Sequence, residues 1–285
     1  MEIKASQVKE LRDMSGVAMM ECKRALVECE GDLDKALDLL RSNSSLKAEK
    51  KASRVAADGI IRIVSSDGYA TIIEINSETD FAAKDPGFIA FADDVVNYVS
   101  NNKVDNISMF ASTEIEEKRL ALIQKIGENI QLRRMETIEF DNSMSVGSYM
   151  HSDGKLATLV VTSNSDDNLA KDVAMHIAAS NPLCKTPDDI DSEVLEREKA
   201  IFEVQAKESG KDDAIMNKMV EGKVRKFLAE VSLTSQAFIK DPDMTVGKLL
   251  SDNGADVTGY VRFKVGEGIE VETKSFADEV ADQLK

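Results

Sequence analysis

The chain has few of the residues from which metal centres and catalytic sites are usually built. It contains no tryptophan, two histidines and three cysteines, and aromatic residues make up only 5% of it. The cysteines, Cys22, Cys29 and Cys184, form no C-x-x-C pair, so we do not expect a structural zinc site. Buried or free thiols in a reducing compartment are the simpler prediction.

Long apolar runs and a surplus of positive charge are lacking as well. No stretch approaches the roughly 18 apolar residues of a membrane span, and residues 1–7 contain no apolar run like that of a signal peptide. We therefore expect a cytoplasmic protein without a membrane segment. The formal net charge of -16, from 52 acids against 36 bases, disfavours direct nucleic-acid binding and fits a protein partner or plain solubility.

The motifs of nucleotide-binding and hydrolytic enzymes are also missing. No G-x-x-x-x-G-K-[ST], G-x-G-x-x-G, G-x-S-x-G or H-E-x-x-H occurs, and the glycine-rich run at 265–268 has no phosphate-loop context. His176 lies on or beside an apolar helix face, which predicts an interior residue. His151 precedes the Asp153-Gly154 turn, and the sequence does not decide between a structural and a functional role for it. The residues favour a binding protein over an enzyme, and we assign no catalytic, cofactor-binding or metal-binding residue.

What is present is a chain of 285 residues with 42% hydrophobic and 31% charged residues, enough for two domains and a sizeable core. Residues 1–45 have the pattern of three short helices, with Ser6 and Ser15 as candidate caps and Gly31-Asp32 as a stop followed by a cap. Met14 is expected to pack in the core of this small bundle. Met19 and Met20 are adjacent and cannot both face that core, so the pair fits either core packing or a surface that contacts a partner.

The segment from Ser42 to Arg54 reads as a basic linker. Its lysines and arginine stand out in an acidic protein: Lys47, Lys50, Lys51 and Arg54. A solvated connector is the first interpretation, and an electrostatic contact with an acidic partner is the second.

The centre of the chain repeats one unit, a β-hairpin followed by a helix. Strands at 55–64 and 69–75 flank an Asp-Gly turn and precede a helix at 88–99; strands at 146–151 and 156–162 flank a second Asp-Gly turn and precede a helix at 168–180. A helix at 114–126 and a strand at 130–140 separate the two copies. We therefore predict two related subdomains with antiparallel sheets.

The two copies differ in the connection between hairpin and helix. The first copy contains an additional segment, Thr79-Asp80-Phe81, within a polar loop. Phe81 on such a loop either folds back as a plug for the local core or is held out for a partner. Because the second copy is connected without the segment, the fold does not need it, and a function is the better explanation.

The last third of the chain is mainly helical. Helical patterns at 191–207 and 212–231, on either side of Ser209-Gly210-Lys211, predict an αα-hairpin. Its thin apolar seam fits either a projection that self-associates or an internal contact alone. The seam consists of Val194, Leu195, Ile201, Phe202, Val204, Ile215, Met216, Met219, Val220, Phe227 and Leu228. An irregular segment at 232–242, a helix at 245–250 and a strand at 257–265 follow. A final amphipathic helix at 275–284 is expected to dock on its own domain, with a partner as the alternative.

Two stretches resemble the bacterial elongation factor Ts family, the guanine-nucleotide exchange factors of elongation factor Tu. They are residues 11–26, which include Asp13-Met14-Ser15-Gly16-Val17, and residues 74–84, which include Asn76-Ser77-Glu78-Thr79-Asp80-Phe81. Shorter matches occur at 126–130, 147–151 and 265–270, so the resemblance covers essentially the whole chain. Departures are mild: Ser15 stands where Thr is usual, Ala18 where Gly is common and Ala82 where Val is usual.

The resemblance implies an α+β fold with a three-helix ubiquitin-associated-like module at its N-terminus. The implied parts are that module (1–45), the basic linker (46–54), core subdomain N (55–143), core subdomain C (144–190 with 232–265), a protruding helical hairpin (191–231) and a C-terminal helical module (266–285).

The resemblance also implies a partner, elongation factor Tu, and the residues that contact it. Thr79, Asp80, Phe81 and Ala82 would act beside the Mg²⁺ and phosphate site of that GTPase. Flanking contacts would come from Met19, Met20, Lys23, Ile126, Gly127, His151, Phe238, Ile239, Phe276 and Val280. The alternative function is an adaptor that binds partners through the ubiquitin-associated-like module.

Overall fold

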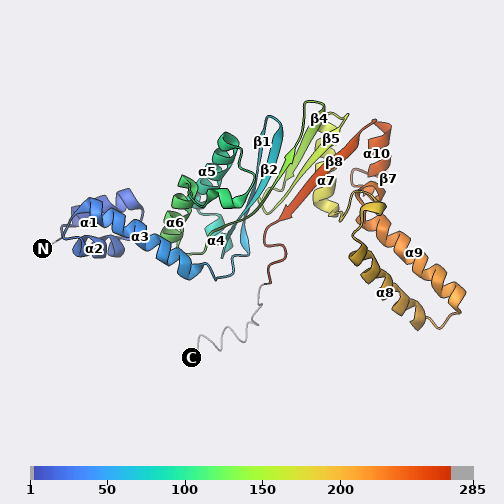
Figure 1. Cartoon of the computed structure of the whole chain (residues 1–285), viewed down its shortest axis with the longest axis horizontal. Helices are drawn as coiled ribbons and strands as arrows, with labels where there is room; N and C mark the ends of the chain where they lie inside the picture. The colour runs from blue at the N-terminus through green and yellow to red at the C-terminus, as the bar shows by residue number, and fades with distance from the viewer. Residues whose placement is uncertain (1–2, 271–285) are drawn as a thin grey trace.

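The computed structural model describes residues 3–270, which form an elongated row of parts (Figure 1). A three-helix module lies at one end, a mixed core in the middle and a helical hairpin at the other end. The expected C-terminal helix with Phe276 and Val280 lies outside the described residues.

The N-terminal module consists of α1 (Ala5–Ser15), α2 (Met19–Glu28) and the first half of α3 (Leu33–Lys51), packed around residues such as Leu11 and Leu26. Asp32 caps α3, as expected, by accepting from the Lys35 N–H at 3.0 Å. The expected caps Ser6 and Ser15 were wrong: both lie inside α1. The Ser15 hydroxyl donates backward to the Leu11 carbonyl at 2.6 Å instead of capping α2.

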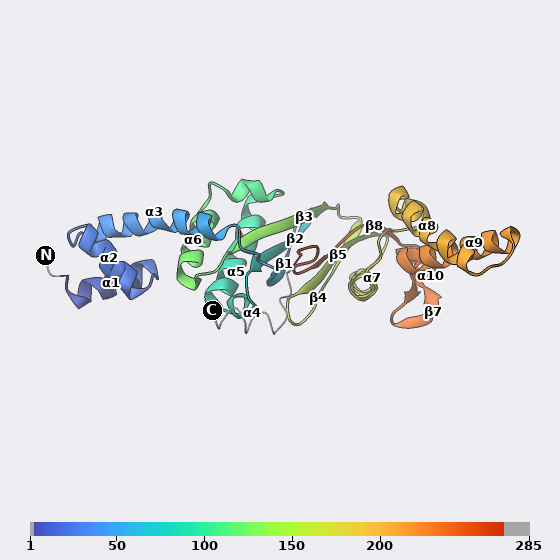
Figure 2. The ribbon, with the colours of Figure 1, turned by 90° about the horizontal axis from the view of Figure 1, so that it is seen from below.

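The expected linker is helical rather than an irregular connector. Helix α3 continues through it to Lys51, because residues 42–51 contain neither proline nor glycine to end the helix. Ala48 is buried against the first core subdomain, and Lys47 Nζ pairs with Glu21 Oε2 at 2.6 Å. The module is therefore joined to the core by a packed helix, which lies beside α6 in Figure 2.

The core contains the two predicted hairpins, each in a three-stranded antiparallel sheet of the described chain. The first sheet has the order β1 (Asp58–Ser66), β2 (Tyr69–Ser77), β3 (Gln131–Glu139). The second sheet has the order β4 (Met144–Met150), β5 (Leu156–Ser163), β8 (Asp256–Lys264). The repeat read from the sequence is thus present as two sheets, and the final strand of each comes from a distant part of the chain.

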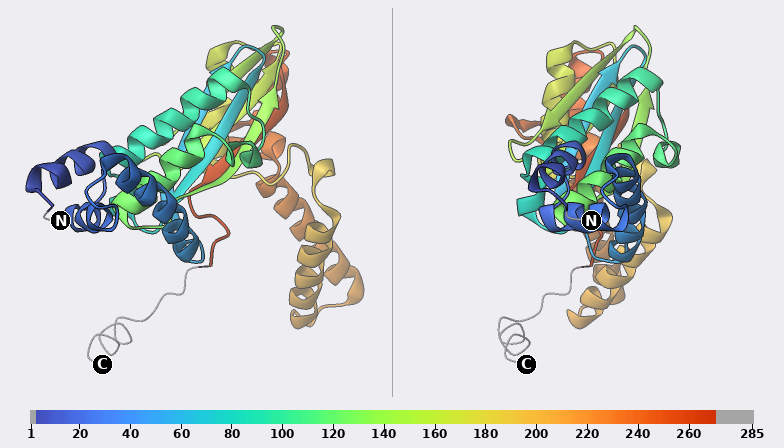
Figure 3. Two further views of the ribbon diagram at one scale, coloured as in Figure 1. Left: turned by 60° about the vertical axis from the view of Figure 1, so that its left-hand side comes forward. Right: turned by 90° about the vertical axis from the view of Figure 1, so that its left-hand side faces the viewer.

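The two sheets pack face to face and helices cover their outer faces (Figure 3). Helices α5 (Pro86–Asn102) and α6 (Glu114–Ile126) lie on the first sheet; α7 (Asp167–Ser180) and α10 (Val246–Asp252) lie on the second. Between the sheets, Ile61 and Ile72 pack against Ala157 and Phe263. A Cβ at Gly147 would lie 2.1 Å from the Ala170 carbonyl oxygen, so only glycine permits this close approach of α7 to β4.

A fully buried carboxylate, Glu74, links the first sheet to the segment that follows the second. Its oxygens accept from Arg133 Nη1 (2.8 Å), Arg134 Nε (2.6 Å) and the Gly266 N–H (2.8 Å). Burial opposes ionisation, but these hydrogen bonds outweigh it and hold the pKa of Glu74 below its usual value. The Arg134 guanidinium also lies 4.1 Å from the centre of the Phe263 ring.

The glycine-rich run at 265–268 has a structural role in this contact. Gly266 has a φ of +72°, and a Cβ there would lie 2.2 Å from the Ala57 carbonyl oxygen. The glycine lets the chain approach β1 closely enough for its N–H to reach Glu74. The glycine-rich run therefore completes the contact between the first sheet and the segment that follows the second sheet.

The helical hairpin consists of α8 (Ser192–Glu208) and α9 (Asp213–Val231), which project from the core (Figure 1). Its seam is thinner than expected: Ala206 and Val220 are buried, and Phe202 packs edge-on against Phe227 with ring centres 6.3 Å apart. Four residues assigned to the seam are exposed instead, namely Val194, Ile201, Val204 and Ile215. A short hairpin of β6 (Ala237–Phe238) and β7 (Asp241–Thr245) replaces part of the expected irregular segment.

His176 is the interior histidine that its helix position predicts, and its side chain is fully buried. Its Nε2 lies 2.9 Å from Gln236 Oε1, and its Nδ1 accepts from the Ile239 N–H at 3.4 Å. Burial lowers the pKa of His176 because the charged ring would lose its hydration. The neutral ring satisfies both contacts, whereas a proton on Nδ1 would face another donor.

We expect this histidine to make folding pH-dependent. Because its folded-state pKa is lowered, its stabilising contribution is complete above the ordinary histidine pKa of about 6.5 and is lost progressively as the pH falls below that value. Urea unfolding should show that the free energy of unfolding decreases as the pH is lowered from about 7.5 to about 5.5, a range above that in which carboxylates titrate. His176→Gln should remove this slope, whereas the matched variant His151→Gln should keep it; equal slopes would contradict the assignment.

Candidate functional site

The Phe81 segment is one turn of helix, α4 (Asp80–Ala83), rather than the expected loop. Thr79 caps it, since its hydroxyl oxygen accepts from the Ala82 N–H at 3.3 Å. Ala82 and Ala83 point inward and are buried, which leaves Phe81 on the outer side with 81% of its surface exposed. Phe81 is therefore not a plug for the local core.

The base of α4 is fastened to the turn that follows α6. The carboxylate of Glu128 accepts from the Thr79 N–H at 3.0 Å and from the Thr79 hydroxyl at 2.7 Å. In the opposite direction, the Asn129 N–H donates to Glu78 Oε1 at 2.7 Å. Glu128 lies within the family match at 126–130, but the sequence alone assigned it no role, because its pairing with Thr79 joins residues far apart in the chain.

The expected contact residues Ile126 and Gly127 directly precede Glu128 and Asn129, which make these hydrogen bonds. Ile126 is partly buried against the core of the first subdomain. Gly127 ends α6 with a φ of +91°, a conformation that favours glycine. Both residues therefore have a structural role at the base of α4, which leaves a contact with a partner as a separate proposal.

A groove of about 590 Å³ lies beside α4, between this helix and the turn after β4. It brings together Asp80 and His151, two expected site residues from different subdomains. Apolar side chains, including Ile60, Ile89 and Met150, line it, and its polar members are Arg62, Asp80, Lys84, His151, Ser152, Asp153 and Lys155. The groove thus offers an apolar floor with a charged rim next to the exposed aromatic ring.

Both carboxylates that line the groove, Asp80 and Asp153, already have a partner within it. Lys84 Nζ lies 2.6 Å from Asp80 Oδ2, and this hydrogen bond holds the pKa of Asp80 below its usual value. His151 Nδ1 lies 3.0 Å from Asp153 Oδ1. The pKa of Asp153 is lowered by the Lys155 N–H and then by His151. Both carboxylates are therefore ionised at neutral pH, and an entering partner would meet carboxylates that already have hydrogen-bond partners.

A second exposed apolar surface lies on the N-terminal module. Met14, Met19 and Met20 all have exposed side chains, so the expectation that Met14 packs in the core was wrong. Met20 and Lys23 line a shallow hollow on α2 together with Val27. The bundle closes around other apolar residues, such as Leu11 and Leu26, and Met14, Met19 and Met20 remain outside.

The two expected flanking residues of the second subdomain have different environments. Phe238 is only 5% exposed and packs in the core under α7 and α10, so its ring is not available for a surface contact. Ile239 is exposed and follows it on the outer side. Neither residue lines the groove beside α4.

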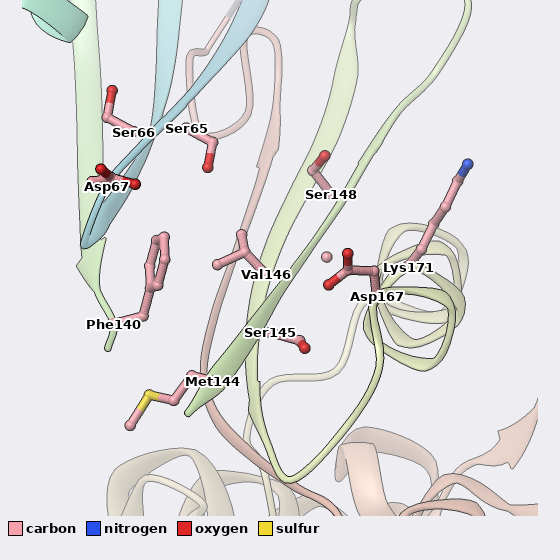
Figure 4. Close-up of a pocket in the computed structure, with 11 residues that line it drawn as sticks. Ser65, Ser66, Asp67, Phe140, Met144, Ser145, Val146, Ser148, Asp167 and Lys171 are labelled. Carbon is pink, nitrogen blue, oxygen red and sulfur yellow. The ribbon is translucent and has the colours of Figure 1, made fainter. Parts of the chain in front are cut away.

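Another hollow, of about 640 Å³, lies at the turn end of the first hairpin (Figure 4). Ser65, Ser66 and Asp67 line one side of it, and residues of β4 and α7 line the other. Figure 4 shows Lys171 extending away from Asp67, so these polar groups do not converge. None of the expected site residues lines this hollow.

The part of the chain that the structure describes has neither a cluster of metal ligands nor a membrane-spanning helix. Across residues 3–270, no group of three or more His, Cys, Asp or Glu side chains is placed to hold a metal ion. Within that described range, no helix combines the length and the apolar character that crossing a membrane requires.

Comparison with known proteins gives one consistent family. The family model described as Elongation factor TS matches residues 78–267. Elongation factor Ts of Hahella chejuensis is 50% identical over 285 residues, covering 99% of this chain and 99% of the relative. Those of Saccharophagus degradans (50% over 286 residues) and Teredinibacter turnerae (48% over 287 residues) each cover 100% of this chain and 98% of the relative.

The contrast between two nearby phenylalanines gives a direct test of the site's geometry. Phe81→Ala should change the free energy of unfolding by no more than about 0.5 kcal/mol, because the ring is exposed. Phe88→Ala, seven positions later in a fully buried site, should cost about 3–5 kcal/mol. Urea unfolding of both variants provides the comparison; a large loss for Phe81→Ala would mean that the ring packs against the fold.

Proposed function

The chain belongs to the elongation factor Ts family of translation elongation factors, and we propose that it promotes GDP release from elongation factor Tu in the bacterial cytoplasm. The observation that carries the proposal is the exposed Phe81 on α4, a helical turn that the second copy of the repeat does not need. An aromatic ring exposed on a fixed element is suited to filling a partner's pocket, because it offers a large area and loses little rotamer freedom.

The thermodynamic basis of exchange is linkage. A protein that binds a nucleotide-free GTPase more tightly than the nucleotide-bound form must weaken nucleotide binding by the same factor. No covalent step is needed, and the chain's own residues supply only contacts. Everything therefore depends on which partner elements those contacts displace.

In the proposed complex, Phe81 enters the GTPase next to its Mg²⁺ and phosphate site. GDP is held there largely by Mg²⁺ and by backbone amides around the phosphates. A ring wedged between these elements would displace the Mg²⁺ ligands, so the ion would no longer offset the phosphate charge. Asp80 would enter beside Phe81, with its carboxylate oriented by Lys84, and would compete for donors around the site.

Two further surfaces support the same interaction in our proposal. The groove beside α4, with His151 on its rim, would receive a neighbouring element of the partner. The module would add Met19, Met20 and Lys23 on α2, whose place is set by Glu21. That carboxylate accepts from Lys47 at 2.6 Å and from Gln124 at 3.3 Å, which ties α2 to α3 and α6. Contacts held at fixed separation bind together without a further ordering cost.

The remaining contacts are assigned by position. Ile126 and Gly127 would support the core contact from below α4, and Ile239 would add a flanking contact. The four exposed apolar residues of α8 and α9 favour self-association of the projecting hairpin over an internal seam alone.

Removing the ring should impair exchange without affecting folding. Phe81→Ala should slow GDP release from elongation factor Tu by about 30-fold, the factor that corresponds to a hot-spot loss of about 2 kcal/mol. Stopped-flow release of a fluorescent GDP analogue at a fixed concentration of the chain measures this rate. Leu183→Ala, which removes an exposed apolar side chain beside the end of α9, should release GDP at the unchanged rate; an unchanged rate for Phe81→Ala would refute the wedge.

The alternative function is an adaptor that binds through the exposed methionines of the module. Binding experiments with bacterial lysate distinguish the two functions, because an exchange factor must lose its GTPase when GDP is supplied. We expect the immobilised chain to retain elongation factor Tu without nucleotide and to release it with excess GDP. Retention that is indifferent to GDP and to Phe81→Ala would favour the adaptor.

A further inference from the structure

We propose that Glu128 fixes Phe81 in its outward position before the partner arrives. This inference rests on the proposed function and adds a positioning residue to it. Glu128 lies on the turn after α6, on a different element from the ring it would control.

The need for such a residue follows from the length of α4. A helix of four residues has no stability of its own, because the first turn fixes several backbone angles for a single hydrogen bond. Phe81 is largely exposed, so its own packing contributes little to holding the turn. The direction of the ring therefore depends on what holds the backbone beneath it.

Glu128 holds that backbone at the cap residue of α4, Thr79. Both carboxylate oxygens are used, one by the Thr79 N–H and the other by the Thr79 hydroxyl. Because the hydroxyl hydrogen points to Glu128, the hydroxyl oxygen is free to accept from the Ala82 N–H and cap the turn. The contact thus orients the hydroxyl of Thr79 that caps the turn. The negative charge of the Glu128 carboxylate strengthens both of the hydrogen bonds that it accepts.

The support beneath Glu128 is rigid. Asn129 is buried, and its side chain donates to the Arg54 carbonyl at 2.8 Å. Its N–H returns a hydrogen bond to Glu78, the neighbour of Thr79. Two hydrogen-bonded contacts in opposite directions therefore join residues 78–79 to residues 128–129. Without Glu128, α4 would lose the contact between Glu128 and Thr79 and would spend less time in the helical state.

The expected consequence is a loss of apparent affinity. If only a fraction of molecules presents the ring correctly, the apparent dissociation constant rises by the inverse of that fraction. Glu128→Ala should raise the half-saturating concentration in the GDP-release assay about tenfold, while the rate at saturation is nearly kept. Glu117→Ala is the matched control, because Glu117 is an exposed glutamate on α6 outside the contact; its exchange should match that of the parent chain.

Two measurements separate positioning from general damage. Amide hydrogen exchange of residues 79–84 should become faster in Glu128→Ala, while exchange in β2 and α5 stays unchanged. Thr79→Ser keeps the hydroxyl that Glu128 orients and should retain the amide protection of residues 79–84, whereas Thr79→Val should lose that protection as Glu128→Ala does. Loss of protection across the whole first subdomain would show that Glu128 acts on the fold, and would overturn the proposal.

A double-mutant cycle provides the decisive test. If Glu128 acts through the ring, Glu128→Ala should have no further effect on GDP release in a Phe81→Ala chain. Additive losses would show that Glu128 contacts the partner itself and would overturn the positioning role. Slow release by Phe81→Ala with unchanged half-saturation for Glu128→Ala would refute this inference alone; unchanged release by Phe81→Ala would refute the proposed function.

Discussion

The buried carboxylate of Glu74 is the interaction on which the core depends most. It lies between two packed sheets and accepts from two arginines and from a backbone N–H beyond the second sheet. Removing one partner of such a buried pair usually costs about 3–5 kcal/mol, since the remaining charge is left without compensation. The contact therefore fixes how the two copies of the repeat lie on each other, which in turn places His151 across the groove from α4.

The same strand connects this contact to the proposed site. β2 carries Glu74 near its end and leads directly through Thr79 into α4. The strand is buried along its whole length, whereas the turn that follows exposes the largest apolar surface of the segment. A rigid base with an exposed tip is what an inserted ring requires, because little motion remains to be frozen when the partner binds.

The regular elements could be predicted from the sequence because their signals are local. Apolar spacing and Asp-Gly turns gave both hairpins and the helices around them, and the longer connection in one copy singled out Phe81. Errors arose where tertiary contacts override local patterns. The basic linker is part of α3, whose Ala48 packs on the core. Met14 lies outside a bundle filled by other apolar residues, and Phe238 is buried beneath α7.

The sequence by itself thus determined most of the regular elements, the duplication, the family and the residue most suited to contact a partner. Each of these follows from residues that are near one another in the chain or from the pattern of the chain as a whole. Only the tertiary structure decided that Phe81 is exposed on a helical turn and that Glu128 holds this turn through Thr79. The physical reason is that hydrogen bonds between distant segments depend on how the sheets and helices pack, and no local pattern records that packing.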